Sequence, residues 1–235
     1  MTTSFRAPEP GAIRWAATIR GGRELTLVGR ADLRDWTDHL RPEGYTPFDA
    51  GGYAEVTIGA TDLQWLGVQF TELVVSITVC DPQNPPSRLG YYLVQGWNSI
   101  RFFAYSERRF FSAPYQHGKT IVNTVPPAGM TLRVGGKERF RAELRTEAAG
   151  TEIIDEEWIG PIFLPGTRNR TGHFFMATLA GPVEHFDFDR GSDTVSIPSP
   201  TEIPVFGMLQ SSAFQGVAWR LRTKALHRKS GTMIR

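Results

Sequence analysis

Hydrophobic and polar residues alternate over many short stretches of the chain, and glycine or proline separates most of them. This alternation predicts strands at residues 13–19, 23–29, 53–58, 70–79, 121–125, 130–134, 139–146, 174–179, 185–188 and 217–226. Residues 89–105 are apolar and aromatic, and we expect a buried strand there followed by the start of a short helix. Residues 31–40 repeat apolar side chains at helical spacing before Pro42, which predicts a helix. The pattern is typical of a mainly β fold with one antiparallel sheet, curled or doubled, and a few helices at its edges.

Turn and loop signals divide these strands without dividing the chain into domains. Gly-Gly pairs at 21–22 and 135–136 predict turns, and residues 81–87, with three prolines, predict a loop. Residues 155–157 (Asp-Glu-Glu) are expected in a solvated loop. The chain has no internal repeat and no long linker, so residues 1–235 are expected to form a single domain. Residues 1–12 would be an N-terminal arm and residues 221–235 a basic C-terminal tail.

The composition is that of a globular protein with no cofactor signature. Of 235 residues, 40% are hydrophobic and 21% charged, and the formal net charge is +2. No apolar run reaches the roughly 18 residues of a membrane span. Cys80 is the only cysteine, which excludes an internal disulfide and predicts a cytoplasmic protein. The basic residues after Trp219 carry no interleaved aromatic residues, so we expect a solvated terminus and no nucleic-acid or membrane partner.

Standard catalytic motifs are absent from the sequence. It contains no Gly-x-Ser-x-Gly elbow, no P-loop and no Gly-x-Gly-x-x-Gly fingerprint. Cys80 ends an apolar strand and is expected to be a buried, inert thiol. His185, Asp187 and Asp189 would share one face of a strand and, with Glu184, could ligate a metal. A polar outer face above Phe186 and Phe188 is the simpler interpretation, so we expect no metal.

Two carboxylates lie within apolar strands and are the best candidates for chemistry. Glu55 and Glu72 either face outward or line a polar pocket inside a barrel-like sheet, because an inward carboxylate is costly unless it is paired. Burial and a neighbouring carboxylate would shift the pKa of such a group toward acid–base use. Arg23 could be its counter-ion, or could orient a substrate carboxylate.

Short sequence pieces, in the same order, resemble acetoacetate decarboxylase. The resemblance covers about residues 22–220, and no single piece is decisive. The pieces are residues 22–32 (Gly-Arg-Glu to Ala-Asp), residues 53–56 (Tyr-Ala-Glu-Val), residues 70–72 (Phe-Thr-Glu), residues 107–115 (Glu-Arg-Arg to Pro-Tyr), and a C-terminal series at 181–182, 186–187, 203–205 and 211–212.

This resemblance implies a fold, a pocket and an assembly. It implies a large, curled antiparallel sheet that forms a cone or closed barrel around a buried pocket. It places Arg23, Glu55 and Glu72 in that pocket. It also implies a homo-oligomer, a dimer or larger, because members of the family associate.

The chain departs from the family at the lysine that forms a Schiff base with the substrate. The two family lysines read Tyr115 and Gln116 here, and a tyrosine cannot form an imine. Acetoacetate decarboxylation is therefore not expected. Lys119 lies four residues beyond and is the candidate displaced amine. Gln116, Lys119 and several aromatic residues are expected to line the pocket, the aromatic ones being Trp65, Phe70, Trp97, Phe102 and Phe111.

The sequence leaves three hypotheses for function. The first is a cofactor-free enzyme of small-molecule, secondary metabolism that cyclises, isomerises or dehydrates a polyketide-like or oxo-acid substrate. Glu72 or Glu55 would abstract a proton, and Arg23 or Tyr115 would hydrogen-bond the oxyanion, unless the pocket only folds the substrate for a pericyclic closure. The second is a barrel that binds a hydrophobic molecule without changing it. The third is a residual Schiff-base decarboxylase or aldolase that uses Lys119.

Overall fold

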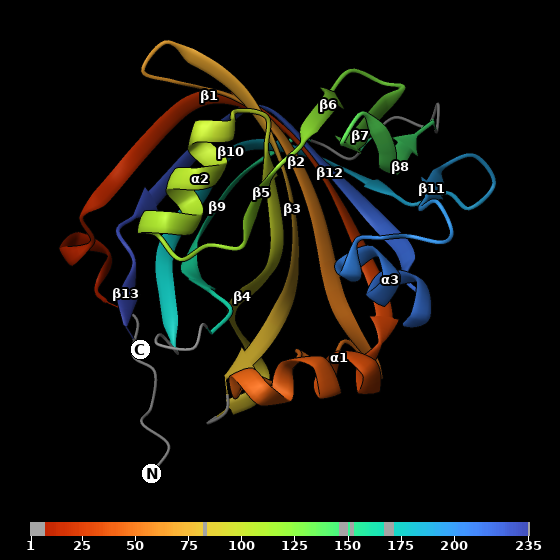
Figure 1. The fold of residues 1–235 in the computed structure, drawn as a ribbon, viewed down its shortest axis with the longest axis horizontal. Helices are drawn as coiled ribbons and strands as arrows, with labels where there is room; N and C mark the ends of the chain where they lie inside the picture. The colour runs from red at the N-terminus through yellow and green to blue at the C-terminus, as the bar shows by residue number, and fades with distance from the viewer. Residues whose placement is uncertain (1–7, 82–83, 146–149, 151–152, 167–171, 235) are drawn as a thin grey trace.

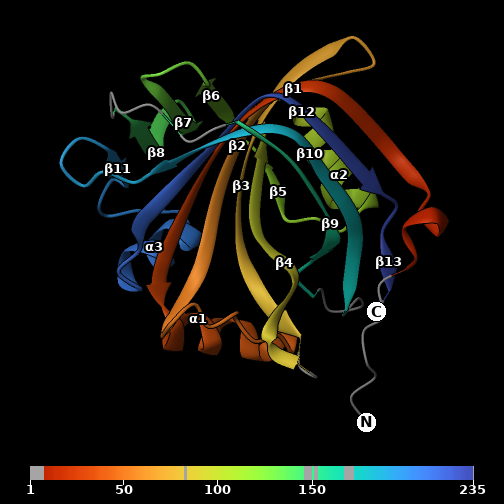
Figure 2. The same cartoon turned by 180° about the vertical axis from the view of Figure 1, so that it is seen from behind.

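The computed structural model describes residues 8–81, 84–145, 150, 153–166 and 172–234. A strongly curled sheet dominates it (Figures 1 and 2). Its strands are β1 (Trp15–Asp32), β2 (Tyr53–Trp65), β3 (Val68–Asp81), β4 (Asn84–Asn98), β5 (Tyr115–His117), β9 (Ile154–Phe163), β10 (His173–Asp187), β12 (Gln215–Ser230) and β13 (Met233–Ile234). The order β12-β1-β2-β3-β4-β9-β10 closes into a ring because β10 also pairs with β12. The predicted mainly β fold with a curled antiparallel sheet is confirmed.

A second, smaller sheet and a helix pack outside this ring. The sheet has the order β11 (Thr194–Ser196), β8 (Lys137–Leu144), β7 (Ala128–Val134) and β6 (Lys119–Asn123). Gly135 and Gly136 form the predicted turn between β7 and β8, with positive φ angles of 60° and 79° that glycine tolerates. Helix α3 (Pro204–Ser211) lies beside this sheet (Figure 1).

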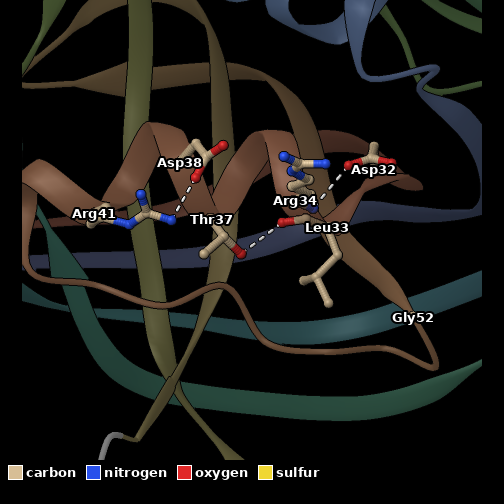
Figure 3. A pocket seen from close by; sticks show the side chains of 7 residues that line it. All are labelled: Asp32, Leu33, Arg34, Thr37, Asp38, Arg41 and Gly52. Atoms are coloured by element: carbon tan, nitrogen blue, oxygen red, sulfur yellow. Dashed lines mark hydrogen bonds and ion pairs between the residues drawn. The ribbon is translucent and has the colours of Figure 1, made fainter.

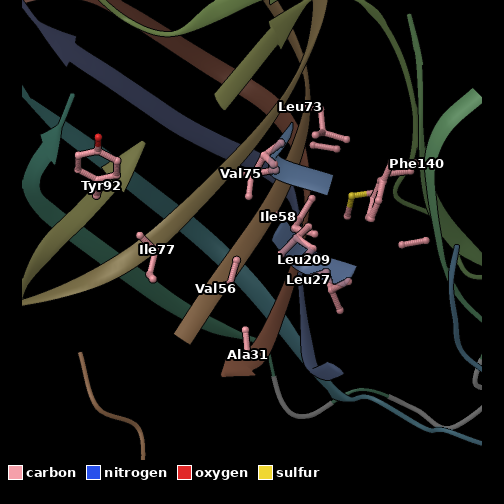
Figure 4. Close-up of a cluster of buried hydrophobic side chains, with 14 of the residues drawn as sticks. Leu27, Ala31, Val56, Ile58, Leu73, Val75, Ile77, Tyr92, Phe140 and Leu209 are labelled. Atoms are coloured by element: carbon pink, nitrogen blue, oxygen red, sulfur yellow. The ribbon is translucent and has the colours of Figure 1, made fainter. Parts of the chain in front are cut away.

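The main hydrophobic core lies between the ring and these outer elements. Successive side chains of a strand point to opposite faces, so alternate residues of β1–β3 turn outward into the core. Figure 4 shows this layer, which includes Leu27, Val56, Ile58, Leu73, Val75 and Ile77. Three aromatic rings stack through it: Trp97 of β4 on Phe206 of α3, with centroids 5.3 Å apart, and Phe206 on Phe140 of β8, 5.4 Å apart. The opposite faces of the same strands are left for the inside of the ring.

Two helices follow strands where the sequence predicts them. Helix α1 (Leu33–Leu40) begins two residues later than predicted because residues 31 and 32 still pair with β2. Asp32 caps it by accepting hydrogen bonds from the backbone N–H groups of Arg34 (2.8 Å) and Asp35 (3.0 Å). Figure 3 shows this helix and the polar surface hollow beside it. Helix α2 (Arg101–Phe110) follows β4, as expected.

Some predicted loops and turns are strands in the structure. Gly21 has a φ of 72° and forms an irregularity within β1, so the Gly-Gly pair does not separate two strands. Strand β4 begins at Asn84, inside the predicted loop, of which residues 82–83 lie outside the described residues. Residues 155–157 belong to β9 rather than to a solvated loop.

The prediction of a basic C-terminal tail at residues 221–235 is also wrong for most of its length. Residues 221–230 belong to β12, which pairs with β1 on one side and β10 on the other, and do not form a separate basic tail. Because the segment is paired on both sides, apolar residues such as Leu221 and Ala225 are buried. Of the predicted N-terminal arm, residues 1–7 lie outside the described residues, and Pro10–Ala12 form one helical turn. Across the described ranges, no helix is both long and apolar enough to cross a membrane.

Candidate active site

The inner face of the ring encloses a cavity of about 820 Å³. Its lining side chains alternate along each strand with those of the outer core. On β2 the lining includes Glu55, Gly59 and Thr61, and on β3 it includes Phe70, Glu72, Val74 and Thr78. Glu55 and Glu72 therefore both face the cavity, which is the inward alternative of the sequence analysis.

One row of polar residues crosses the cavity wall at the same height. The pairings Arg222↔Glu24, Glu24↔Thr61, Thr61↔Glu72 and Glu72↔Asn98 connect β12, β1, β2, β3 and β4. All five side chains line the cavity. Because directly paired residues of neighbouring strands point the same way, this row brings two carboxylates into one belt.

Glu72 is the most chemically perturbed group of the belt. Its Oε1 accepts a hydrogen bond from Asn98 Nδ2 (2.8 Å), and the Tyr115 hydroxyl donates to its Oε2 over 3.5 Å. Burial, followed by the negative charge of Glu107, raises the pKa of Glu72 to about 7, against smaller opposing effects of Asn98, Lys229 and Tyr115. A carboxyl group with this pKa can both accept and donate a proton near neutral pH.

Tyr115 is a hydrogen-bond donor in this site. Burial, followed by the charge of Glu72, raises the pKa of its phenol well above 10, so the O–H group stays protonated. Its backbone is held by β5, which pairs in parallel with β4 so that Tyr115 lies against Gly96. A side chain at Gly96 would collide with the phenol ring, with a Cβ only 2.8 Å from ring carbons.

An ion pair between Lys229 and Glu107 lies beside Glu72. Lys229 comes from β12 and Glu107 from α2, and both line the cavity. The Lys229 ammonium also lies over the rings of Phe111 (4.4 Å) and Phe175 (4.6 Å). The sequence analysis missed Lys229 because it assigned residues 221–235 to a tail. The strand predicted at 217–226 is the signal in the sequence, and the structure extends it to Ser230, which brings Lys229 into the sheet.

The other carboxylate of the belt, Glu24, has a different environment. Arg222 donates to Glu24 (3.0 Å) and to Glu156 (3.1 Å), and the side chains of Glu24 and Arg222 are almost fully buried. His227 Nε2 lies 3.4 Å from Glu24, and burial lowers the pKa of His227, so the imidazole is neutral at physiological pH. Glu156 also contacts His185 Nε2 at 2.7 Å. Glu24 and Arg222 are the centre of an ion-pair network that the sequence does not predict.

Glu55 belongs to a second polar cluster at the other end of the cavity. It accepts hydrogen bonds from Thr78 (2.8 Å) and from Arg88 (2.8 Å). Thr78, the β3 residue hydrogen-bonded to Glu55, lies six residues along the strand from Glu72. At about 3.3 Å per residue, roughly 20 Å of backbone separates Thr78 from Glu72. The two predicted carboxylates therefore share a cavity but cannot act on the same bond, and the carboxylate neighbour of Glu72 is Glu107.

The predicted aromatic lining is only partly in place. Trp65, Phe70, Phe102 and Phe111 line the cavity. Trp97 does not, because it lies on the outer face of β4 in the stacked aromatic core, one residue before the inward Asn98.

Three polar residues predicted for the pocket also lie outside it. Arg23 is on the face of β1 opposite Glu24, has a side chain 53% exposed and pairs with Asp62. Gln116 is exposed on β5, next to the inward Tyr115. Lys119 is exposed on β6 of the second sheet, so it cannot supply an amine to the cavity.

The described residues offer no metal-binding cluster. Within the described ranges, no group of three or more His, Cys, Asp or Glu side chains is placed to hold a metal ion. Asp189, from the cluster considered in the sequence, accepts hydrogen bonds from Gly191 N (2.8 Å) and Ser192 Oγ (2.9 Å) in a turn.

Comparisons with known proteins agree with this architecture at the level of the fold. No protein-family model matches the sequence, and no curated protein matches it. Among solved structures, acetoacetate decarboxylase from Legionella pneumophila superposes with a TM-score of 0.65 at 10% identity, covering 99% of this chain and 93% of that chain. The enduracididine biosynthesis enzyme MppR complexed with pyruvate gives 0.63 at 12% identity, covering 96% and 93%. An acetoacetate decarboxylase-like enzyme from Sphingomonas wittichii RW1 gives 0.59 at 15% identity, covering 91% and 90%.

The chain therefore has the acetoacetate decarboxylase-like fold, as the resemblance in the sequence predicts.

Proposed function

We propose that this chain is a cofactor-free acid–base enzyme that moves a proton beside a carbonyl group of a small organic substrate. The observation that supports this most is Glu72: a carboxyl group in the cavity wall, with a pKa of about 7 and hydrogen-bond donors on both oxygens. Isomerisation, cyclisation and dehydration of a polyketide-like or oxo-acid substrate all begin with this step.

The proposed step is a proton abstraction. Ionised Glu72 takes the proton from the carbon α to the carbonyl, and the C–H electron pair moves to the carbonyl oxygen. The Tyr115 hydroxyl and the Lys229 ammonium are the donors that would stabilise the resulting enolate. Protonated Glu72 then gives this proton to another carbon in an isomerisation, or to the alkoxide that forms when the enolate carbon attacks a second carbonyl in a cyclisation. In a dehydration it gives the proton to the β-hydroxyl group, which leaves as water as the enolate collapses to the carbon–carbon double bond.

Deuterium exchange tests this proposal without knowledge of the natural substrate. The α-protons of 4-phenylbutan-2-one would be followed by proton NMR in D₂O. We expect exchange above the buffer rate, with a rate that rises as pH passes through 7, and a loss of at least about 100-fold in Glu72→Gln. Asp62→Asn is the matched control, because Asp62 is a β2 carboxylate outside the cavity lining. Equal rates in wild type and Glu72→Gln would contradict the role of Glu72.

A Schiff-base enzyme is the second candidate, favoured only by the presence of Lys229 in the cavity. An ammonium held between a carboxylate and two aromatic rings is stabilised as a cation, whereas a Schiff-base lysine must react as a free amine. We therefore expect no covalent adduct when the protein is treated with pyruvate or acetoacetate and borohydride and its intact mass is read. An adduct on Lys229 would replace the proton-transfer proposal.

A further inference from the structure

The cavity has two polar ends, and only one of them contains Glu72. The second end is formed by Glu55, Arg88, Tyr91 and Arg220, which we call the outer cluster. Thr78 of β3 donates a hydrogen bond to Glu55 of β2 and pairs with Tyr91 of β4. Arg220, from β12, hydrogen-bonds the Tyr91 hydroxyl, so a residue of one ring strand contacts a strand that is not its neighbour in the ring. The outer cluster is thus a network of hydrogen-bond donors and acceptors that three strands, β2, β4 and β12, contribute.

The wall between the two ends combines small and apolar residues with the hydroxyl side chains of Thr57 and Ser76, which pair with each other. Gly59 and Val74 face the cavity between the two ends, and Ile162 and Phe175 line it from β9 and β10. The cavity of about 820 Å³ is far larger than a three-carbon acid needs, since such an acid fills the space of only a few water molecules at about 30 Å³ each. This space fits an elongated molecule.

Seven of the charged side chains that line the cavity are paired with one another, and Arg220 donates to the neutral Tyr91 hydroxyl. Arg222 pairs with Glu24 and Glu156, Arg88 with Glu55, and Lys229 with Glu107. A charged substrate would have to break one of these pairs, whereas hydroxyl and carbonyl groups can join them as extra hydrogen-bond partners. The arrangement therefore favours an uncharged ligand over a small carboxylic acid.

We propose that the cavity binds an elongated, uncharged ketone, with its carbonyl at Glu72 and a distal hydroxyl or phenol group at the outer cluster. This inference rests on the proposed function for the role of Glu72 and assigns to Glu55 the recognition of the far end. Glu55 Oε1 and Oε2 would accept the distal hydroxyl in competition with Thr78 and Arg88. Glu55 is then a specificity residue and not a second catalytic base.

A matched pair of ketones tests this arrangement by binding alone. The probes are 1,7-bis(4-hydroxyphenyl)heptan-3-one and 1,7-diphenylheptan-3-one, which differ only in the terminal hydroxyl groups. Dissociation constants would be measured by calorimetry with wild type, Glu55→Gln, Gly59→Val and the control Asp62→Asn. We expect wild type and Asp62→Asn to bind the bis-phenol about tenfold or more tightly than the diphenyl compound, and Glu55→Gln to lose most of that preference.

The glycine variant tests the length of the cavity independently. A Cβ at Gly59 would meet Thr26 and Val74 at 3.5 Å, an ordinary contact, so Gly59→Val should fold and extend its side chain into the middle of the cavity. We expect it to weaken both long ketones about tenfold or more. Equal affinity of wild type for the two ketones, or unchanged affinity in Gly59→Val, would overturn the inference.

Binding and exchange separate this inference from the proposed function. Selective binding of the bis-phenol without deuterium exchange in any ketone would support the two-ended cavity and contradict proton transfer by Glu72. Exchange in 4-phenylbutan-2-one without the expected preference between the long ketones would support Glu72 and contradict the outer cluster as a recognition site.

Discussion

Glu24 and Glu72 lie in the same row of the cavity wall, yet their neighbours give them opposite properties. Glu24 is buried beside Arg222, which pairs with it at 3.0 Å. Glu72 is half-buried in the cavity wall, beside the neutral donors Asn98 and Tyr115 and near the negative charge of Glu107, and its pKa rises to about 7. Removal from water alone therefore does not make a carboxylate reactive. A cation on the next strand, such as Arg222, compensates the negative charge of the carboxylate, whereas a neutral neighbour such as Asn98 does not.

The largest expected effect comes from removing the cation beside Glu24. Arg222→Met keeps much of the side-chain stem but leaves Glu24 buried without its partner, so we expect the free energy of unfolding to fall by about 3–5 kcal/mol. Urea unfolding at neutral pH measures this. A loss below about 1 kcal/mol would mean that Glu24 does not depend on Arg222 and would remove the contrast with Glu72.

Substitution of Glu72 is expected to raise the free energy of unfolding, whereas substitution of Arg222 lowers it. The folded pKa of Glu72, about 7, lies above the ordinary value of 4.5, so the folded state holds the proton more tightly, and wild-type stability falls as pH rises from 4.5 to 7. Glutamine cannot ionise and avoids this loss. We expect Glu72→Gln to be more stable than wild type above pH 7 by about 2–3 kcal/mol, and equally stable below pH 4.5. Unfolding measured across this pH range would show a constant difference if Glu72 were not perturbed.

A smaller effect is expected from Tyr115→Phe, which keeps the ring against Gly96 and removes only the O–H donor. The hydrogen bond of Tyr115 is among the effects that lower the pKa of Glu72, so its loss should raise that pKa. The bond is long, 3.5 Å, and we expect the free energy of unfolding to change by less than about 1 kcal/mol. The midpoint of the pH–exchange profile should move to higher pH; a move to lower pH would contradict the assignment of Tyr115 as donor.

The smallest effect is expected at Arg23, the arginine that the resemblance placed in the pocket. Its ion pair with Asp62 is exposed, so Arg23→Ala should change the free energy of unfolding by no more than about 0.5 kcal/mol and leave deuterium exchange unaltered. A large loss of deuterium exchange in Arg23→Ala with a normal melting temperature would contradict the placement of Arg23 outside the active site.

Alternation of apolar residues predicts the curled sheet, because it indicates which positions form strands. It leaves the direction of Glu55 and Glu72 open, and the family resemblance is what places them in the pocket. The sequence predicts individual lining residues poorly, because one position decides the face of a strand. Arg23 was chosen where Glu24 points inward, and Trp97 where Asn98 does. The pairing of β1 with β12 shifts register on both sides of Gly22, next to Arg23, and the family resemblance does not indicate this shift.

Residues far apart in the sequence account for the rest. Glu107, Arg222 and Lys229 reach the cavity from α2 and from the last ring strand, and only the closure of the ring brings them beside Glu24 and Glu72. A basic C-terminal segment looks solvated until its pairing with β1 and β10 is known. The pKa of Glu72 likewise depends on burial and on Glu107, neither of which is visible in its own strand.

The central claim, that Glu72 holds its proton near neutral pH, can be measured directly. Infrared difference spectra between wild type and Glu72→Gln, recorded over a pH series, isolate the carbonyl stretch of the protonated Glu72 carboxyl group. The account predicts that this band is present at acidic pH and disappears with a midpoint of about pH 7. A midpoint near the ordinary value of 4.5 would show that Glu72 is an unperturbed carboxylate and would contradict the proposed acid–base chemistry.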